Sequence, residues 1–201
     1  GVAMAEGSTL DGFTVTGVGK YDDALWKKHH ATQGNKQEYR KIGAPGTAGI
    51  EVRHDCTVAN NIVHHIGYTG IGISGAKDRR VSPLITGNFC YRNMGGGIGS
   101  MRGSTALITG NTCFENFYAG IGHMHASPTV TKNVCYENVR AGIGVAAGSK
   151  PVLRGNKCYR NRRAGIGIRT GGETNPLVEG NECYENDMAG IGTDDGAAPF
   201  I

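Results

Sequence analysis

Short apolar and polar stretches alternate along most of the chain, and Gly and Asn separate them. Segments such as "PLITGN", "FCYRN" and "GGIGS" each suit a strand of three to five residues. No stretch in these segments shows the 3.6-residue apolar period of an amphipathic helix. The pattern therefore predicts an all-β protein built from many short strands.

A glycine-flanked apolar residue recurs along the chain and sets the length of the repeat. Its spacings are 21, 27, 23, 22, 23 and 25 residues. A repeat of this length holds three short strands, so we expect a solenoid whose coils stack about 4.8 Å apart. Equivalent residues then lie above one another. The recurring residues are Ile50, Ile71, Ile98, Ile121, Ile143, Ile166 and Ile191.

Cysteine, asparagine and aromatic residues repeat with the same period. Inward asparagines in turns can hydrogen-bond to their equivalents in neighbouring coils, forming an asparagine ladder. We expect the cysteines to be free, packed thiols, because stacked Cβ vectors run parallel and suit a disulfide poorly. A soft-metal thiolate ladder is the alternative, although burial opposes thiol deprotonation. The cysteine column is Cys90, Cys113, Cys135, Cys158 and Cys183, and an aromatic residue follows each.

The start "STLDGFTVTG" and the "GNxCYxNxxAGIG" coils resemble NosD-like proteins and the wider carbohydrate-binding and sugar-hydrolase type of β-helix. This resemblance covers nearly all of the chain except residues 20–47. It implies a right-handed parallel β-helix of about 7–8 coils of 21–27 residues, in an extracellular or periplasmic protein. Such families include polysaccharide lyases, epimerases and hydrolases, and also copper-delivery accessory proteins, so the fold does not settle the function.

We expect one β-helix domain, residues 1–201, interrupted by an insertion at residues 20–47. The segment "YDDALWKKHH" has acidic residues early and basic residues late, which favours a helix. We expect the insertion to pack against the first coils as a wall or lid beside the glycine strands. No polar cap is visible at either end, which indicates part of a longer solenoid that could self-associate through its ends or its glycine face.

Charge and hydropathy exclude two classes of partner. The formal net charge is only +4, and Lys and Arg alternate with Asp and Glu without forming a basic stripe, so we expect no nucleic-acid partner. No apolar run approaches 18 residues, so we expect no membrane span.

Strand alternation predicts that both glycines beside each isoleucine face outward and form a flat groove. The groove suits close approach of a polysaccharide or oligosaccharide, although these glycines could simply relieve strain at the preceding turn. Arg169 lies on the same face, and Trp26 and Tyr39 of the insertion could stack on sugar rings, or Trp26 could anchor the insertion. The candidate groove glycines are Gly97, Gly99, Gly120, Gly122, Gly142 and Gly144.

Glu51 occupies a position where the other coils have glycine, and Arg53 follows two residues later on the same face. A lone carboxylate beside an arginine on a flat groove is a candidate acid/base or ligand-anchoring pair. The alternative is a surface ion pair.

Two histidine pairs are candidate ligands for a divalent metal such as copper, zinc or calcium. His29 and His30 lie in the insertion, and His64 and His65 lie in the equivalent turn of the next coil. Their spacing matches no zinc-finger or metalloprotease pattern, so ordinary polar surface is the alternative.

Two functions stay open at this point. The first is a β-helix that binds, and in one version modifies, polysaccharide on its glycine face. The second is a structural or copper-type metal-handling solenoid whose flat face mates with another protein.

Overall fold

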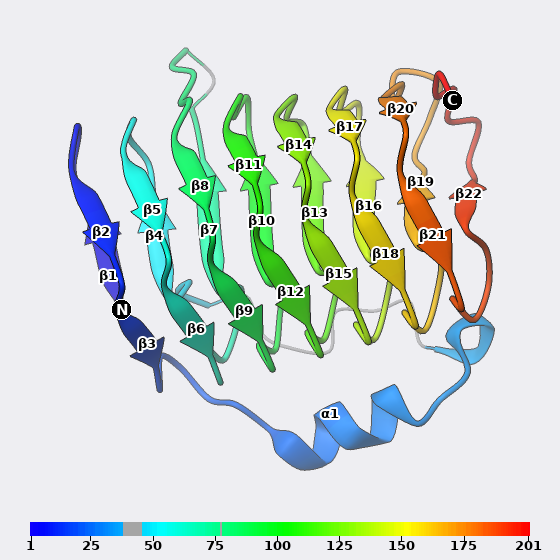
Figure 1. The fold of residues 1–201 in the computed structure, drawn as a ribbon, viewed down its shortest axis with the longest axis horizontal. Helices are drawn as coiled ribbons and strands as arrows, with labels where there is room; N and C mark the ends of the chain where they lie inside the picture. Colours follow the sequence, from blue (N-terminus) through cyan, green and yellow to red (C-terminus); the bar gives the residue numbers. More distant parts are fainter. Residues whose placement is uncertain (38–45, 77) are drawn as a thin grey trace.

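The computed structural model describes residues 1–37, 46–76 and 78–201. Three parallel β-sheets wrap around one core, and the chain visits sheets A, B and C in turn (Figure 1). Sheet A contains β1 (Val2–Met4), β4 (Ile50–Val52), β7 (Ile71–Ser74), β10 (Ile98–Met101), β13 (Ile121–Met124), β16 (Ile143–Ala146), β19 (Ile166–Ile168) and β22 (Ile191–Thr193).

Sheet B contains β2 (Thr9–Asp11), β5 (Thr57–Ala59), β8 (Leu84–Thr86), β11 (Leu107–Thr109), β14 (Thr129–Thr131), β17 (Val152–Arg154) and β20 (Leu177–Glu179). Sheet C contains β3 (Thr14–Thr16), β6 (Ile62–His64), β9 (Phe89–Tyr91), β12 (Thr112–Phe114), β15 (Val134–Tyr136), β18 (Lys157–Tyr159) and β21 (Glu182–Tyr184).

The strands form a solenoid of about six turns, and the uninterrupted coils run from β4 to β21. The predicted seven to eight coils are reached only by adding β1–β3, which precede the insertion, and the single strand β22. Pairing is in register, so that Ile98 lies beside Ile121 and Cys113 beside Cys135. The stacking of equivalent positions that the repeat predicts is therefore confirmed.

Apolar columns fill the interior. The repeated isoleucines of β4 to β19 are fully buried, and Ile85, Ile108 and Val130 face them from sheet B. Strand alternation places the central residue of most sheet B and C strands inward, and two residues of most sheet A strands, such as Ile71 and Ile73. This arrangement leaves each coil with few inward positions, which explains why the same residue types recur there from coil to coil.

Two asparagine ladders close the turns on either side of sheet C. Asn116, for example, is fully buried, and its Nδ2 donates to Cys90 O at 2.9 Å and to Asn138 Oδ1 at 3.1 Å. In the same way the side-chain amides of the ladder hydrogen-bond to the asparagine of the next coil and to a backbone carbonyl of the previous coil, so these buried polar atoms have partners. The ladders are Asn61, Asn88, Asn111, Asn133, Asn156 and Asn181, and Asn93, Asn116, Asn138, Asn161 and Asn186.

The six cysteines are free thiols, as the parallel Cβ vectors predict. Five of them stack in register through sheet C. Burial raises the pKa of the Cys113 thiol well above its usual range. The column therefore behaves as apolar packing.

The insertion is partly helical, as its charge pattern predicts. It contains α1 (Asp23–His30), capped by Asp22, whose carboxylate accepts a hydrogen bond from the Leu25 amide at 2.9 Å, and a 3₁₀ turn η1 (Gly34–Lys36). Figure 1 shows α1 lying alongside the coils, below the strands in that view.

The sequence pattern places the insertion against the first coils. In the structure it extends well beyond them. Trp26 packs with Met94, Phe117 and Val139, which lie in the C-to-A turns of three successive coils. Further along, Gly34 contacts the backbone of Arg162, where no larger residue would fit. Because coils repeat about every 4.8 Å, a helix parallel to the solenoid axis necessarily passes several of them.

Candidate functional site

The outer face of sheet A carries a column of glycines and one acidic residue. Glu51 lies in register with Gly72, and the column continues through the second glycine of each later coil. These residues are partly exposed. A Cβ added to Gly122 would meet no atom within 4 Å, so the floor is open there. At Gly72, Gly99 and Gly144 an added Cβ would lie 3.0, 3.3 and 3.4 Å from the side chains of Ala48, Thr69 and Ala119, so small side chains border the floor at those coils. The later members are Gly99, Gly122, Gly144, Gly167 and Gly192.

The glycine before each isoleucine does not face outward, which corrects the prediction that both glycines do. Gly97, Gly120 and Gly142 are buried. A Cβ on Gly120 would lie 2.9 Å from Gly142 O and 2.9 Å from Asn138 Nδ2. The chain has only just left the turn at this position, so strand alternation does not yet apply. These three glycines let neighbouring coils approach, and of the six predicted groove glycines only Gly99, Gly122 and Gly144 line the face.

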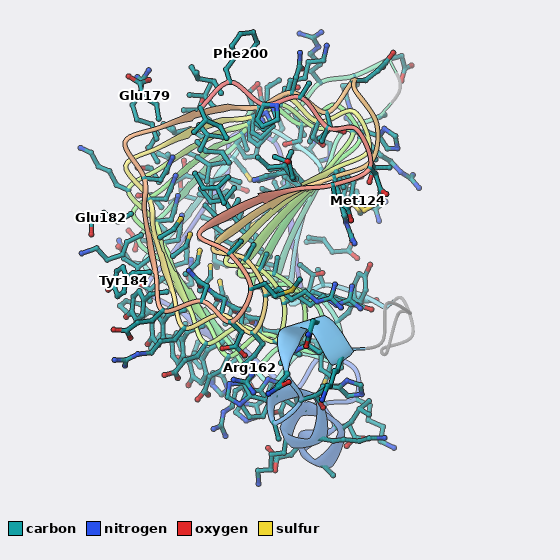
Figure 2. All side chains as sticks on the ribbon, turned by 90° about the vertical axis from the view of Figure 1, so that its right-hand side faces the viewer. Met124, Arg162, Glu179, Glu182, Tyr184 and Phe200 are labelled. Atoms are coloured by element: carbon teal, nitrogen blue, oxygen red, sulfur yellow. The ribbon has the colours of Figure 1, made fainter. Side chains whose placement is uncertain are left out.

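A second outward column runs beside the first. It contains Ser74, Met101, Met124 and Ala146, paired in register. Met124 is 50% exposed, and Figure 2 shows it pointing away from the interior, on the side opposite Tyr184. The face therefore combines a bare glycine floor with an apolar ridge.

Glu51 and Arg53 lie together at one end of this face. Arg53 Nη2 is 3.5 Å from Glu51 Oε2, and both side chains are accessible. The predicted pair is thus in place, with geometry that serves equally for a surface ion pair. Arg169 lies several coils away and is half-buried, and this burial lowers the pKa of its guanidinium.

A shallow depression adjoins the apolar ridge where sheet A strands end. Its volume is about 460 Å³, and it lies at the ends of β7, β10 and β13. The sequence did not reveal this feature, because it depends on the path of the A-to-B turns. Its lining consists of Gly75, Ala76, Arg102, Gly103 and His125.

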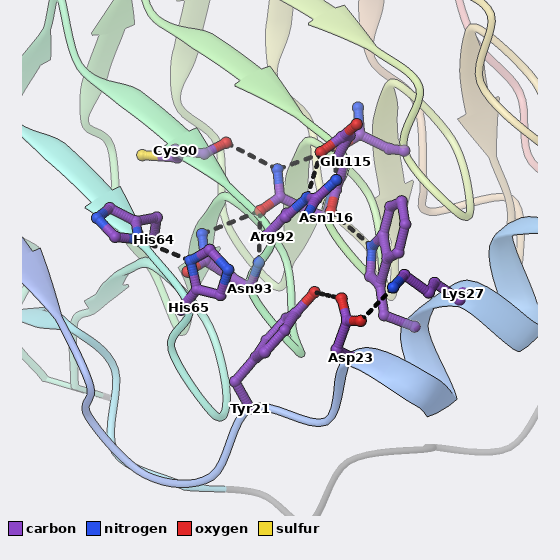
Figure 3. Close-up of polar contacts among 12 residues, drawn as sticks. Tyr21, Asp23, Lys27, His64, His65, Cys90, Arg92, Asn93, Glu115 and Asn116 are labelled. Atoms are coloured by element: carbon purple, nitrogen blue, oxygen red, sulfur yellow. Dashed lines mark hydrogen bonds and ion pairs between the residues drawn. The ribbon is translucent and has the colours of Figure 1, made fainter.

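Trp26 anchors the insertion and is not an exposed platform for sugar rings. Its side chain is 5% exposed, and its Nε1 donates a hydrogen bond to Glu115 O at 2.7 Å. Arg92 lies over the indole at 5.2 Å and forms an ion pair with Glu115 at 2.6 Å. Figure 3 shows Arg92 and Glu115 side by side in the turns next to α1. Tyr39, the other predicted platform, falls outside the described residues.

Tyr21 and Asp23 complete this polar cluster. Tyr21 Oη donates to Asp23 Oδ1 at 3.3 Å, and Lys27 pairs with Asp23 at 2.6 Å. Burial, together with the Asp23 carboxylate, raises the pKa of Tyr21 to about 12. The phenol therefore stays protonated and acts as a donor that holds the start of α1.

The two histidine pairs contact different parts of the structure. His29 packs on Phe117, and His30 stacks on Trp26 with ring centroids 4.7 Å apart. His64 Nδ1 lies 2.7 Å from His65 Nδ1. In the part of the chain that the structure describes, no group of three or more His, Cys, Asp or Glu side chains could hold a metal ion.

Sheet C carries a stacked aromatic column on its outside. Tyr91 and Phe114 have ring centroids 4.8 Å apart and an interplanar angle of 12°, and Phe114 and Tyr136 continue the stack at 4.9 Å. Ring faces are thus turned toward one another. Cross-coil ion pairs flank the stack, including Arg160 with Glu185 at 2.7 Å. The rings and charged groups on this side contact one another, whereas the glycine column of sheet A has no side chains to do so.

Comparison with known proteins identifies the scaffold. The sequence matches the family model "Right handed beta helix region" over residues 30–182 and 118–201. Among solved structures, the fold is similar to the A-module of the mannuronan C-5 epimerase AlgE4 from Azotobacter vinelandii, with a TM-score of 0.54 and 16% identity. That match covers 77% of this chain but 54% of the epimerase module, so the chain spans about half the length of that structure.

A search of curated proteins found no match. In the described segments, no helix is long and apolar enough to cross a membrane. At 16% identity the structural likeness establishes the fold alone.

Proposed function

The chain belongs to the right-handed β-helix family, and on this scaffold we propose that the outer face of sheet A binds a polysaccharide. The observation that carries the proposal is the juxtaposition of a glycine floor with one charged pair. Gly122 and its equivalents carry no side chain over the backbone, and the space beside Gly122 is open, while Glu51 and Arg53 project together from the same face. A sugar chain lying along the coil axis would contact both.

Several features support a long ligand over a compact one. The floor extends over successive coils, and the Met101–Met124 ridge runs parallel to it. Apolar and bare-backbone surfaces suit the faces of sugar rings, and a few polar groups then fix orientation. The structurally similar A-module belongs to a mannuronan epimerase, which is consistent with a carbohydrate ligand for this scaffold.

We further propose that Glu51 has the chemistry for proton transfer on a bound sugar, with Arg53 holding an adjacent anionic or hydroxyl group. We also propose that the protein acts in the periplasm or the extracellular space, because polysaccharides are found there.

The test measures binding of a glycan panel by calorimetry, with acidic and neutral polymers. We expect Glu51→Gln to weaken binding at least tenfold, and Gly122→Leu to weaken it by obstructing the floor. Glu179→Gln is the matched control, since Glu179 also pairs with an arginine but lies on sheet B. Unchanged binding in both sheet A variants, or no binding by the wild-type protein, would refute the proposal.

Turnover is measured separately by following changes in the polymer over time. Loss of turnover in Glu51→Gln with retained binding would assign the carboxylate to chemistry. Equal loss of binding and turnover would assign it to anchoring.

A further inference from the structure

We propose that the depression beside the Met101–Met124 ridge is a subsite for the carboxylate groups of a polyuronate chain. This inference rests on the proposed function and names the substrate class. The depression of about 460 Å³ brings Arg102 and His125 to one place, and none of the described residues that line it carries a carboxylate.

Arg102 and His125 occupy equivalent positions in adjacent coils. Met101 pairs with Met124, and Arg102 and His125 follow them directly. The Arg102 amide donates to Met124 O at 3.2 Å, which fixes the two turns side by side. Both residues have left-handed backbone, with φ of 51° and 53°, and both side chains are exposed. Later coils have Ala147, Thr170 and Asp195 at this position, so the Arg102–His125 pair is confined to the depression.

The adjoining loop adds further positive charge. The backbone of Arg79 exchanges hydrogen bonds with that of Ala76, a lining residue, at 2.9 and 3.3 Å. Arg79 and Arg80 are exposed, and Asp78 is the acidic residue beside them. The rim therefore carries a net positive charge.

The arginines at this site differ from those on sheets B and C because they have no ion-pair partner in the part of the chain that the structure describes. On the sheet B and C sides, Arg92, Arg154 and Arg160 each have a carboxylate partner within 3.0 Å. Among the described residues, no ion pair involves Arg79, Arg80 or Arg102. A guanidinium can hold a carboxylate through two parallel hydrogen bonds, so an unpaired arginine in a depression suits a uronate group.

Small residues shape the site. Gly75 accommodates the turn because a Cβ there would lie 2.5 Å from Arg102 O. Gly103 has φ of 77°. Neither residue has a side chain to fill the space beside Arg102, so a carboxylate can approach.

The register relates this subsite to the Glu51–Arg53 pair. Val52 pairs with Ile73, and Ser74 pairs with Met101, so Arg53 and Met101 lie two coils apart. At about 4.8 Å per coil, the separation across the sheet is about 10 Å. A polymer with carboxylates repeated along its length can therefore meet Arg53 and Arg102 at the same time.

The experiment compares a purified oligouronate with its carboxyl-reduced, neutral counterpart, using calorimetry on the whole chain. We expect the wild-type protein to prefer the acidic form at least tenfold. Arg102→Gln and His125→Gln should each reduce that preference at least threefold without weakening binding of the neutral form. Arg154→Gln removes the same charge from sheet B and should leave the preference unchanged. Circular dichroism and thermal unfolding verify that each variant is folded.

Other outcomes separate the two proposals. Equal binding of both forms, or an acidic preference that persists in Arg102→Gln, overturns the subsite and leaves polysaccharide binding intact. No binding of either form by the wild-type protein overturns both. Equal competition by a sulfated glycan or a single-stranded oligonucleotide overturns carboxylate recognition in favour of a general polyanion surface.

Discussion

Trp26 Nε1 donates a 2.7 Å hydrogen bond to the carbonyl oxygen of Glu115, a residue 89 positions later in the chain. The donor is in the insertion and the acceptor is in a coil turn. This contact, together with the indole packing on Met94, Phe117 and Val139, holds the insertion in place.

Trp26→Phe should destabilise the docked insertion by about 1 kcal/mol, because it removes one hydrogen bond and keeps most of the packing. Trp26→Ala should cost about 3–5 kcal/mol. Amide hydrogen exchange is the measurement. We expect faster exchange in Asp23–His30 and unchanged protection in β10 and β13, whereas equal loss in the strands would show that the insertion is not a separate unit.

Replacing glycine by alanine should have very different effects on the two sides of Ile121. A Cβ on Gly120 would lie 2.9 Å from Gly142 O and Asn138 Nδ2, so Gly120→Ala should destabilise the fold by several kcal/mol. A Cβ on Gly122 meets nothing within 4 Å, so Gly122→Ala should change stability by less than about 0.5 kcal/mol. Chemical denaturation of both variants tests the comparison, and equal losses would contradict it.

His123 should make the fold sensitive to acid. Its imidazole is 2% exposed, no hydrogen-bond partner is found for either nitrogen among the described residues, and burial lowers its pKa to about 3. The unfolded chain, with an ordinary pKa near 6.5, binds a proton first. The free energy of unfolding should therefore fall as pH drops from about 6.5 toward 3, by about 1.4 kcal/mol per pH unit from this group.

His123→Val supplies the matched variant, because the equivalent position in the next coil is Val145. We expect higher stability at pH 5 than in the wild-type protein and a shallower dependence on pH. Denaturant midpoints between pH 4 and 8 provide the measurement. Parallel curves for the two proteins would show that His123 is not the group that titrates.

The asparagine ladder should be more sensitive at its fully buried interior members than at its exposed end. Asn116→Ala removes the acceptor of the Asn93 amide group and the donor to Cys90 O, all of them buried. Unsatisfied buried groups cost about 1–3 kcal/mol each, so we expect a loss of roughly 3 kcal/mol or more. Asn186, at the end of the same ladder and only partly buried, is the control. A loss as large at Asn186 would show that burial does not set the cost.

The scaffold could be predicted from the repeat alone. Once Ile98, Ile121 and Ile143 are aligned, the stacking of Cys113, Cys135 and the asparagines follows from register. Period and residue type carry that information because every coil repeats the same local environment. The Glu51–Arg53 pair was predictable for the same reason, since both residues lie within one strand and its end.

Features outside the repeat were less predictable. Strand alternation assigned Gly120 to the outer face, but this residue lies where the turn enters the strand and its hydrogen atoms face the next coil. The path of the insertion depends on long-range contacts such as Gln37 with Arg163, which no local pattern encodes. The depression at Arg102 and His125 likewise depends on how the turns fold back.

The insertion sets a length for the solenoid beneath it. Its contacts begin at His65, which packs on Tyr21, and end at Arg163, so they touch the turns of five consecutive coils. Adding or deleting one coil between those points would shift one anchor past the other by about 4.8 Å. Repeat arrays ordinarily change length by gain or loss of whole repeats. Such a change would break the contacts of the insertion if it fell between the anchors, and would leave them intact if it fell outside.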